Sequence, residues 1–94
     1  MQYTKLDKDT EYSIEERPAG FRISVIHSRY QFIPDASEVR HACRTTVSSL
    51  AYDVAARRGR RIRPLSEDRI RVDTARNILN GVSSCSAGAT AEYE

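Results

Sequence analysis

Residues 36–58 constrain the fold most, because their apolar side chains repeat with the period of an α-helix. Asp35 follows Pro34 and precedes Glu38 by three residues, which is a variant of the capping box that begins helices. Gly59 stands where a residue in the left-handed conformation usually ends one. We therefore expect one amphipathic helix over residues 36–58, whose apolar side is formed by Val39, Cys43, Thr46, Val47, Leu50 and Val54.

Ahead of this helix, alternating apolar and polar residues predict a β-hairpin. Tyr12 and Ile14 alternate with polar neighbours, and the sequence RPAG at residues 17–20 supplies proline and glycine at favoured turn positions. In the strand after this turn, the alternation of apolar and polar residues changes phase by one residue after Val25. A β-bulge produces such a change, so we expect a bulge or strong bend between Val25 and Ser28. The apolar residues that follow the change of phase are Ile26, Tyr30 and Phe32.

Behind the helix, the sequence predicts a second hairpin. Ile70 and Val72 alternate with charged residues, and Asn80-Gly81 is a strong signal for a two-residue turn because both residues tolerate positive φ. The strand that returns from Val82 consists mostly of small residues, which would let another element approach closely. The expected fold is α+β with the order ββαββ, in which one long helix covers one face of a four-stranded antiparallel sheet.

The length of the chain limits it to one domain. Ninety-four residues bury roughly 60 to 65% of the surface that the unfolded chain exposes, which supports a single core. We expect residues 1–94 to form one domain with loose ends at residues 1–9 and 92–94. An exposed strand edge in so small a sheet must be covered or charged, so a homodimer is an open alternative.

The two cysteines match no metal-ligand spacing. Cys43 and Cys85 are far apart in the sequence, and we expect both to be buried free thiols in a reducing compartment. The N-terminal residues lack the apolar run of a signal peptide, and no stretch approaches the ~18 apolar residues that span a bilayer. The sequence therefore predicts a cytoplasmic protein with no membrane partner, no metal and no cofactor.

Charge is segregated along the chain. Residues 1–16 have a net charge of −3, residues 17–63 carry ten arginines against three acids, and residues 64–94 have a net charge of −2. The basic middle either attracts an anionic partner or pairs with the acidic ends of the same chain. Arginine outnumbers lysine by 13 to 2, which suits planar recognition of carboxylates and phosphates, although a coding bias would give the same ratio.

Five of these arginines lie in the sequence ARRGRRIRP, residues 56–64. Arg57 and Arg58 fall in the last turn of the expected helix, where cations offset the negative end of its dipole. The other three flank an isoleucine in an extended connection that should be exposed, and no helix-end argument covers them. These three residues are Arg60, Arg61 and Arg63.

Together with arginines at the edge of the helix and an Arg-Tyr pair before it, they form the candidate site. Tyrosine and arginine are enriched at the centres of protein interfaces. We expect a small non-enzymatic accessory protein, such as a subunit, assembly factor or inhibitor, that binds an acidic surface of a partner protein. The alternatives are nucleic-acid binding by the same arginines and an ordinary solvated face. The candidate residues are Arg29, Tyr30, Arg40, Arg44, Arg60, Arg61 and Arg63.

Catalysis has little support in the sequence, and no catalytic residue is assigned. His27 and His41 admit a general acid and base pair of the kind that cleaves phosphodiesters, which would make the chain a hydrolase or nuclease. Such a pair requires the fold to bring the two imidazoles together. Neither cysteine has a histidine nearby in the sequence that would activate it.

Overall fold

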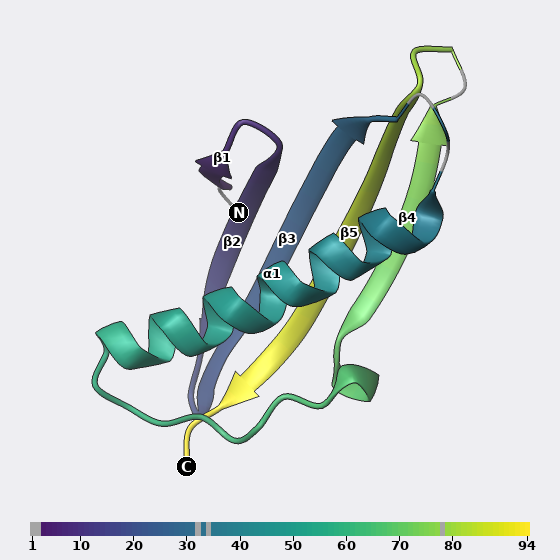
Figure 1. Ribbon diagram of the computed structural model, residues 1–94. Helices are drawn as coiled ribbons and strands as arrows, with labels where there is room; N and C mark the ends of the chain where they lie inside the picture. The colour runs from purple at the N-terminus through teal and green to yellow at the C-terminus, as the bar shows by residue number, and fades with distance from the viewer. Residues whose placement is uncertain (1–2, 32, 34, 78) are drawn as a thin grey trace.

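A computed structural model of the chain describes residues 3–31, 33, 35–77 and 79–94. One antiparallel sheet has the strand order β1-β2-β3-β5-β4, and one helix lies across one of its faces (Figure 1). The expectation of an α+β fold with one helix on an antiparallel sheet is confirmed. The elements are β1 (Thr4–Asp7), β2 (Thr10–Arg17), β3 (Gly20–Tyr30), α1 (Ala36–Arg57), the 3-10 turn η1 (Glu67–Arg69), β4 (Arg71–Asn77) and β5 (Val82–Glu92).

The sheet has five strands, so the expectation of four was wrong by one strand. The additional strand is β1, which pairs with the start of β2 and has a shift in register between Lys5 and Asp7. Its four residues are all exposed and lack the apolar alternation on which strand prediction depends. At the other end of the chain, Glu92 ends β5 and Tyr93 forms a bridge with Ile62.

Strand β3 runs without a bulge. Its residues from Gly20 to Tyr30 pair one to one with β5, and its pairing with β2 is equally regular. The bulge expected after Val25 was therefore wrong. Val25 is buried against the helix, whereas Ile26 is exposed on the opposite face, and this exposed isoleucine imitates a change of phase. Phe32 and Pro34 lie outside the described residues.

The helix follows the sequence prediction closely. Asp35 caps it by accepting a hydrogen bond from the backbone N–H of Glu38 at 3.1 Å. It ends at Arg57, with Arg58 as the C-cap and Gly59 at a φ of +68°. Among the described residues, no helix has the length and apolar character needed to cross a membrane.

The turn between β4 and β5 falls at the expected place but is of a different type. Asn77 pairs with Val82, so the loop has four residues rather than the two of an Asn80-Gly81 turn. Gly81 has a φ of +70°, while Asn80 does not have a positive φ. The side chain of Asn80 instead accepts a hydrogen bond from the backbone N–H of Val82 at 3.0 Å.

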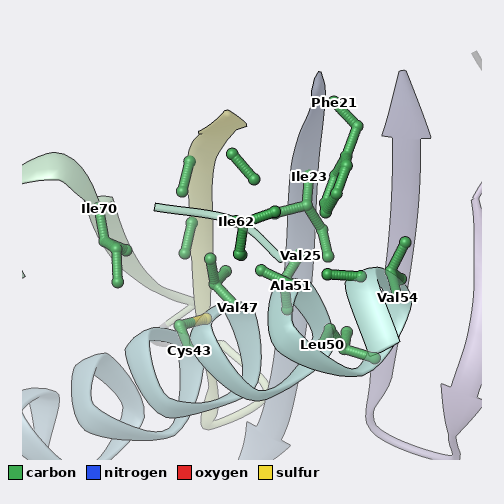
Figure 2. Close-up of a cluster of buried hydrophobic side chains, with 14 of the residues drawn as sticks. Phe21, Ile23, Val25, Cys43, Val47, Leu50, Ala51, Val54, Ile62 and Ile70 are labelled. Atoms are coloured by element: carbon green, nitrogen blue, oxygen red, sulfur yellow. The ribbon is translucent and has the colours of Figure 1, made fainter. Parts of the chain in front are cut away.

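The core lies between α1 and the sheet (Figure 2). Phe21, Ile23 and Val25 project from β3 and are fully buried. The neighbouring strand β5 contributes alanines, whose small side chains allow the helix to pack close to the sheet. The helix contributes Val39, Cys43, Val47, Leu50, Ala51, Val54 and Ala55, and the segments before β4 contribute Ile62 and Ile70.

A disulfide between Cys43 on α1 and Cys85 on β5 crosses this core. Both residues are buried, as expected. The expectation of two free thiols was wrong, because the helix crosses the sheet where these two buried positions meet. The 42 residues that separate the cysteines give no local spacing from which the pairing could be inferred.

Candidate functional site

The seven candidate residues do not form one surface. Arg29 and Tyr30 end β3 close to the start of α1, whereas Arg60, Arg61 and Arg63 follow its end. The 22 residues of α1 correspond to a length of about 33 Å. The molecule measures 44 Å along its longest axis, so the two groups lie toward opposite ends. We call Arg60–Arg63 the basic segment.

The basic segment is extended chain that is fixed against the C-terminal residues. Ile62 is buried in the core and forms a bridge with Tyr93. The backbone N–H of Arg63 donates to the carbonyl of Glu92 at 2.8 Å, and that of Glu94 donates to the carbonyl of Arg61 at 3.0 Å. Because side chains alternate along extended chain, Arg61 and Arg63 point away from the core that receives Ile62.

Arg60, the first residue of this segment, and Arg58, just before it, are held by contacts within the protein. The guanidinium of Arg60 lies 3.8 Å from the centroid of the Tyr93 ring, a cation–π contact. Arg58 donates to both carboxylate oxygens of Glu16, at 2.8 and 2.5 Å, and to the Tyr93 hydroxyl at 2.8 Å. Its guanidinium also lies 5.2 Å from the centroid of the Phe21 ring. Arg58 therefore joins α1 to β2 and to the C-terminus, a role that the sequence did not reveal.

Part of the charge segregation is self-complementary. Arg58 pairs with Glu16 from the acidic N-terminal region, and Arg57 pairs with Asp53 one helical turn earlier at 2.6 Å. Within the part of the chain that the structure describes, Arg61 and Arg63 form no ion pair. Intramolecular pairing therefore accounts for Arg57 and Arg58, and it does not account for Arg61 and Arg63.

The pairing with Arg58 should be visible in the titration of Glu16. The hydrogen bonds from the guanidinium lower the pKa of the Glu16 carboxyl below its ordinary value of 4.5 and raise the pKa of Arg58. Since the folded pKa is the lower one, the stabilisation is present above pH 4.5 and is lost as the pH falls through the folded pKa. We expect Arg58→Gln to return the pKa of Glu16 toward 4.5 in an NMR titration of the carboxyl. A Glu16 titration that is the same in both proteins would contradict the pairing.

The end of β3 presents Tyr30 but not Arg29 as a free side chain. Arg29 donates to Glu38 at 2.7 Å, which joins β3 to the first turn of the helix. Tyr30 is 63% exposed, and its ring lies so close to Gly81 that a Cβ at that position would be 2.7 Å from ring carbon Cε2. Leu79, in the same β4–β5 turn, is 93% exposed. Tyr30 and Leu79 are thus two exposed apolar side chains at this end.

The helix edge contributes less than expected. Arg40 is exposed, but Arg44 is half-buried, and its Nε is fully buried without a hydrogen-bond partner in the described part of the chain. A guanidinium in this position is only partly available to a partner.

The two histidines have different surroundings. Nδ1 of His27 lies 2.8 Å from the Thr10 hydroxyl, and its Nε2 is buried without a hydrogen-bond partner in the described structure. His41 is exposed on α1, with Nε2 3.5 Å from the hydroxyl of Thr45. Among the described residues no hydrogen bond joins the two imidazoles, and the Cys43–Cys85 disulfide leaves neither sulfur as a thiolate nucleophile.

The basic segment is accordingly the surface on which two neighbouring exposed arginines, Arg61 and Arg63, form no ion pair with a described residue, and the end of β3 is the second exposed surface. No protein-family model, no curated protein and no solved structure matches the chain significantly.

Proposed function

We propose that this chain is a small non-enzymatic accessory protein that binds an acidic surface of a partner protein through the basic segment. The observation that supports the proposal is the fixed backbone beneath Arg61 and Arg63, whose charges no described residue neutralises. Guanidinium groups fit carboxylates with two parallel hydrogen bonds. Because the backbone is already ordered, binding loses less conformational entropy than it would on a loose loop.

The surroundings of the segment favour a protein over a nucleic acid as the partner. Glu92 and Glu94 lie beside it, so the segment presents separate positive charges among carboxylates rather than the continuous basic surface that a phosphate backbone requires. Two arginines two residues apart on extended chain are separated by about 7 Å, which suits two discrete acidic side chains. The nucleic-acid alternative uses the same arginines. The dependence of binding on salt concentration distinguishes it from a protein partner.

The test is a double charge reversal, Arg61→Glu with Arg63→Glu. We expect it to weaken binding of the partner by about tenfold or more, because two charge-assisted contacts become repulsive. The partner is first captured from an extract of the native host by cross-linking, and its affinity is then measured with purified proteins. The matched control, Lys5→Glu with Lys8→Glu, changes the net charge equally at exposed N-terminal positions. Equal affinity of wild type and the Arg61 and Arg63 variant would refute the proposal.

Salt dependence separates the two kinds of partner. Binding to duplex DNA weakens with a log–log slope of about −0.9 per neutralised phosphate, whereas an interface with few ion pairs loses much less. A mobility shift with RNA or DNA at low salt that the Arg61 and Arg63 reversal abolishes would replace the protein partner by a nucleic acid.

The cytoplasmic location expected from the sequence is a separate proposal, and the disulfide opposes it. Disulfides persist mainly in oxidising compartments and are rare in the cytosol. The redox state of Cys43 and Cys85 in intact cells therefore decides the location. Rapid alkylation of both thiols before lysis would support the cytoplasm, and complete protection would place the chain in an oxidising compartment.

A further inference from the structure

The second face of the sheet contains a glycine that the protein's own structure does not require. Gly88 lies in the middle of β5, with Ser24 of β3 on one side and Arg71 of β4 on the other. A glycine inside a strand is less stable than alanine by roughly 0.5 to 1 kcal/mol. Such a glycine usually marks a bulge, a bend or a close approach by another group.

None of the intramolecular reasons applies to Gly88. The pairing of β5 continues one to one on both sides of it, and its φ is not positive. A Cβ at this position would make only ordinary contacts, 3.6 Å from the Ile23 carbonyl oxygen and 4.0 Å from the Ser24 hydroxyl. At Gly20, by contrast, a Cβ would collide with the carbonyl of Ala91. The space over Gly88 is thus open to a group from outside the chain.

This space is the floor of a hollow of about 390 Å³, which we call the Gly88 hollow. Arg22 and Arg71 contribute guanidinium groups from the strands on either side of β5, and neither forms an ion pair with a described residue. Glu15 faces Arg22 across the strands, but its carboxylate lies 3.5 Å from Arg17. Neither guanidinium of the hollow is therefore engaged in an ion pair with a described residue.

The remaining walls supply an aromatic ring and hydrogen-bonding groups. Tyr3 precedes β1, yet it lines the hollow together with Ser24 and Ile26 of β3, so its side chain reaches over β2. Ser13 of β2 is only 5% exposed although it lies on this uncovered face, as a ring lying above it would explain. Asp73, two residues after Arg71 on the same strand, offers a carboxylate acceptor.

We infer that the Gly88 hollow binds a nucleoside monophosphate group. The phosphate lies between Arg22 and Arg71, whose forks match its oxygens. The base stacks on Tyr3, and Asp73 accepts hydrogen bonds from the ribose hydroxyls. The volume falls within the range of about 300 to 1,000 Å³ that is usual for small-ligand sites. The nucleotide is either free or one unit of an RNA strand.

Binding is measured by NMR titration of the whole chain with AMP, adenosine, inorganic phosphate and a short oligoadenylate. We expect AMP to shift the Gly88 and Arg71 amides in a saturable manner. Adenosine lacks the phosphate and inorganic phosphate lacks the ring, so each should bind about tenfold more weakly or worse. Oligoadenylate that binds more tightly than AMP through the same residues identifies RNA as the source of the nucleotide, and AMP that binds as tightly identifies the free nucleotide.

Two variants test whether AMP binds in the Gly88 hollow. Arg71→Gln removes one cation and should weaken AMP binding about tenfold, while Gly88→Val fills the floor of the hollow and should abolish binding. Arg40→Gln, an exposed arginine on α1 and outside the hollow, is the matched control and should bind as wild type does. Circular dichroism confirms that each variant is folded. The absence of saturable shifts, or shifts that both Arg71→Gln and Gly88→Val leave unchanged, would overturn the inference.

The proposal of a protein partner and the proposal of nucleotide binding can be refuted independently. The Arg61→Glu with Arg63→Glu variant should bind AMP as wild type does, because neither residue lines the Gly88 hollow. Loss of AMP binding in that variant would mean that the phosphate lies on the basic segment and would overturn the assignment to the hollow.

Discussion

Reduction of the Cys43–Cys85 disulfide should lower the free energy of unfolding by about 4 kcal/mol. The bond closes a long loop, with a sequence separation of 42 residues, and the chain-entropy estimate for such a loop gives this value. It also joins the helix to β5, the strand that pairs with both β3 and β4. The free energy of unfolding of a small domain is about 5 to 15 kcal/mol, so the reduced protein should be only marginally stable.

The measurement is urea unfolding with and without a phosphine reductant, followed by circular dichroism. Reduction of the wild type changes the bond without changing any side-chain volume, so it isolates the effect of the cross-link. The variant Cys43→Ala with Cys85→Ala should be at least as unstable, because it also leaves space in the core. As the control, the alanine variant should not respond to the reductant. A midpoint of the wild type that is the same in both conditions would show that the cross-link contributes little.

The helix was predictable because its signals are local. Asp35, the apolar period and Gly59 all lie within or next to the element that they define. Strand β1 was not predictable, because its exposed residues carry no alternation and its place depends on pairing with β2. The apparent bulge after Val25 shows the reverse error, since the exposed Ile26 resembles a core residue in the sequence alone.

The candidate site was predictable only in part, because some of its contacts join residues that are far apart in the sequence. The sequence separates Arg60, Arg61 and Arg63 from the helix end, but it cannot show that Arg60 lies on the ring of Tyr93, far along the chain. One signal was present. The buried residues of β5 alternate along the strand, and Tyr93 continues their phase; they are Ser83, Cys85, Ala87, Ala89 and Ala91. An aromatic residue in that phase indicates a C-terminus that is packed rather than loose.

The alternation of buried and exposed residues predicts that the two cysteines are buried, but it does not predict that they pair. Cys43 lies on the apolar side of the helix, and Cys85 shares the inward phase of β5 with Ala87. Each position alone predicts burial. Their pairing depends on where the helix crosses the sheet, which is set by the packing of side chains from three elements and not by any short pattern.

Replacement of Phe21 by alanine should destabilise the protein by about 3 to 5 kcal/mol, the usual cost of removing a fully buried phenylalanine. Phe21 meets the Tyr93 ring edge-on at 6.0 Å and lies beneath the Arg58 guanidinium. Replacement of Phe21 by alanine therefore removes a packing contact of Tyr93, the ring on which the Arg60 guanidinium lies. Phe21→Leu keeps most of the apolar volume and should cost less than about 1.5 kcal/mol.

Urea unfolding of both variants beside Ile26→Ala tests this expectation. Ile26 is a large apolar residue that is partly exposed on the other face of the same strand, so its replacement should change stability by about 1 kcal/mol or less. A Phe21→Ala variant as stable as Ile26→Ala would show that Phe21 does not support the core. The affinity for the partner adds a functional readout under conditions where every variant is folded. Phe21→Ala should bind more weakly than Phe21→Leu although Arg61 and Arg63 are unchanged, because the proposed site depends on a fixed backbone as well as on charge.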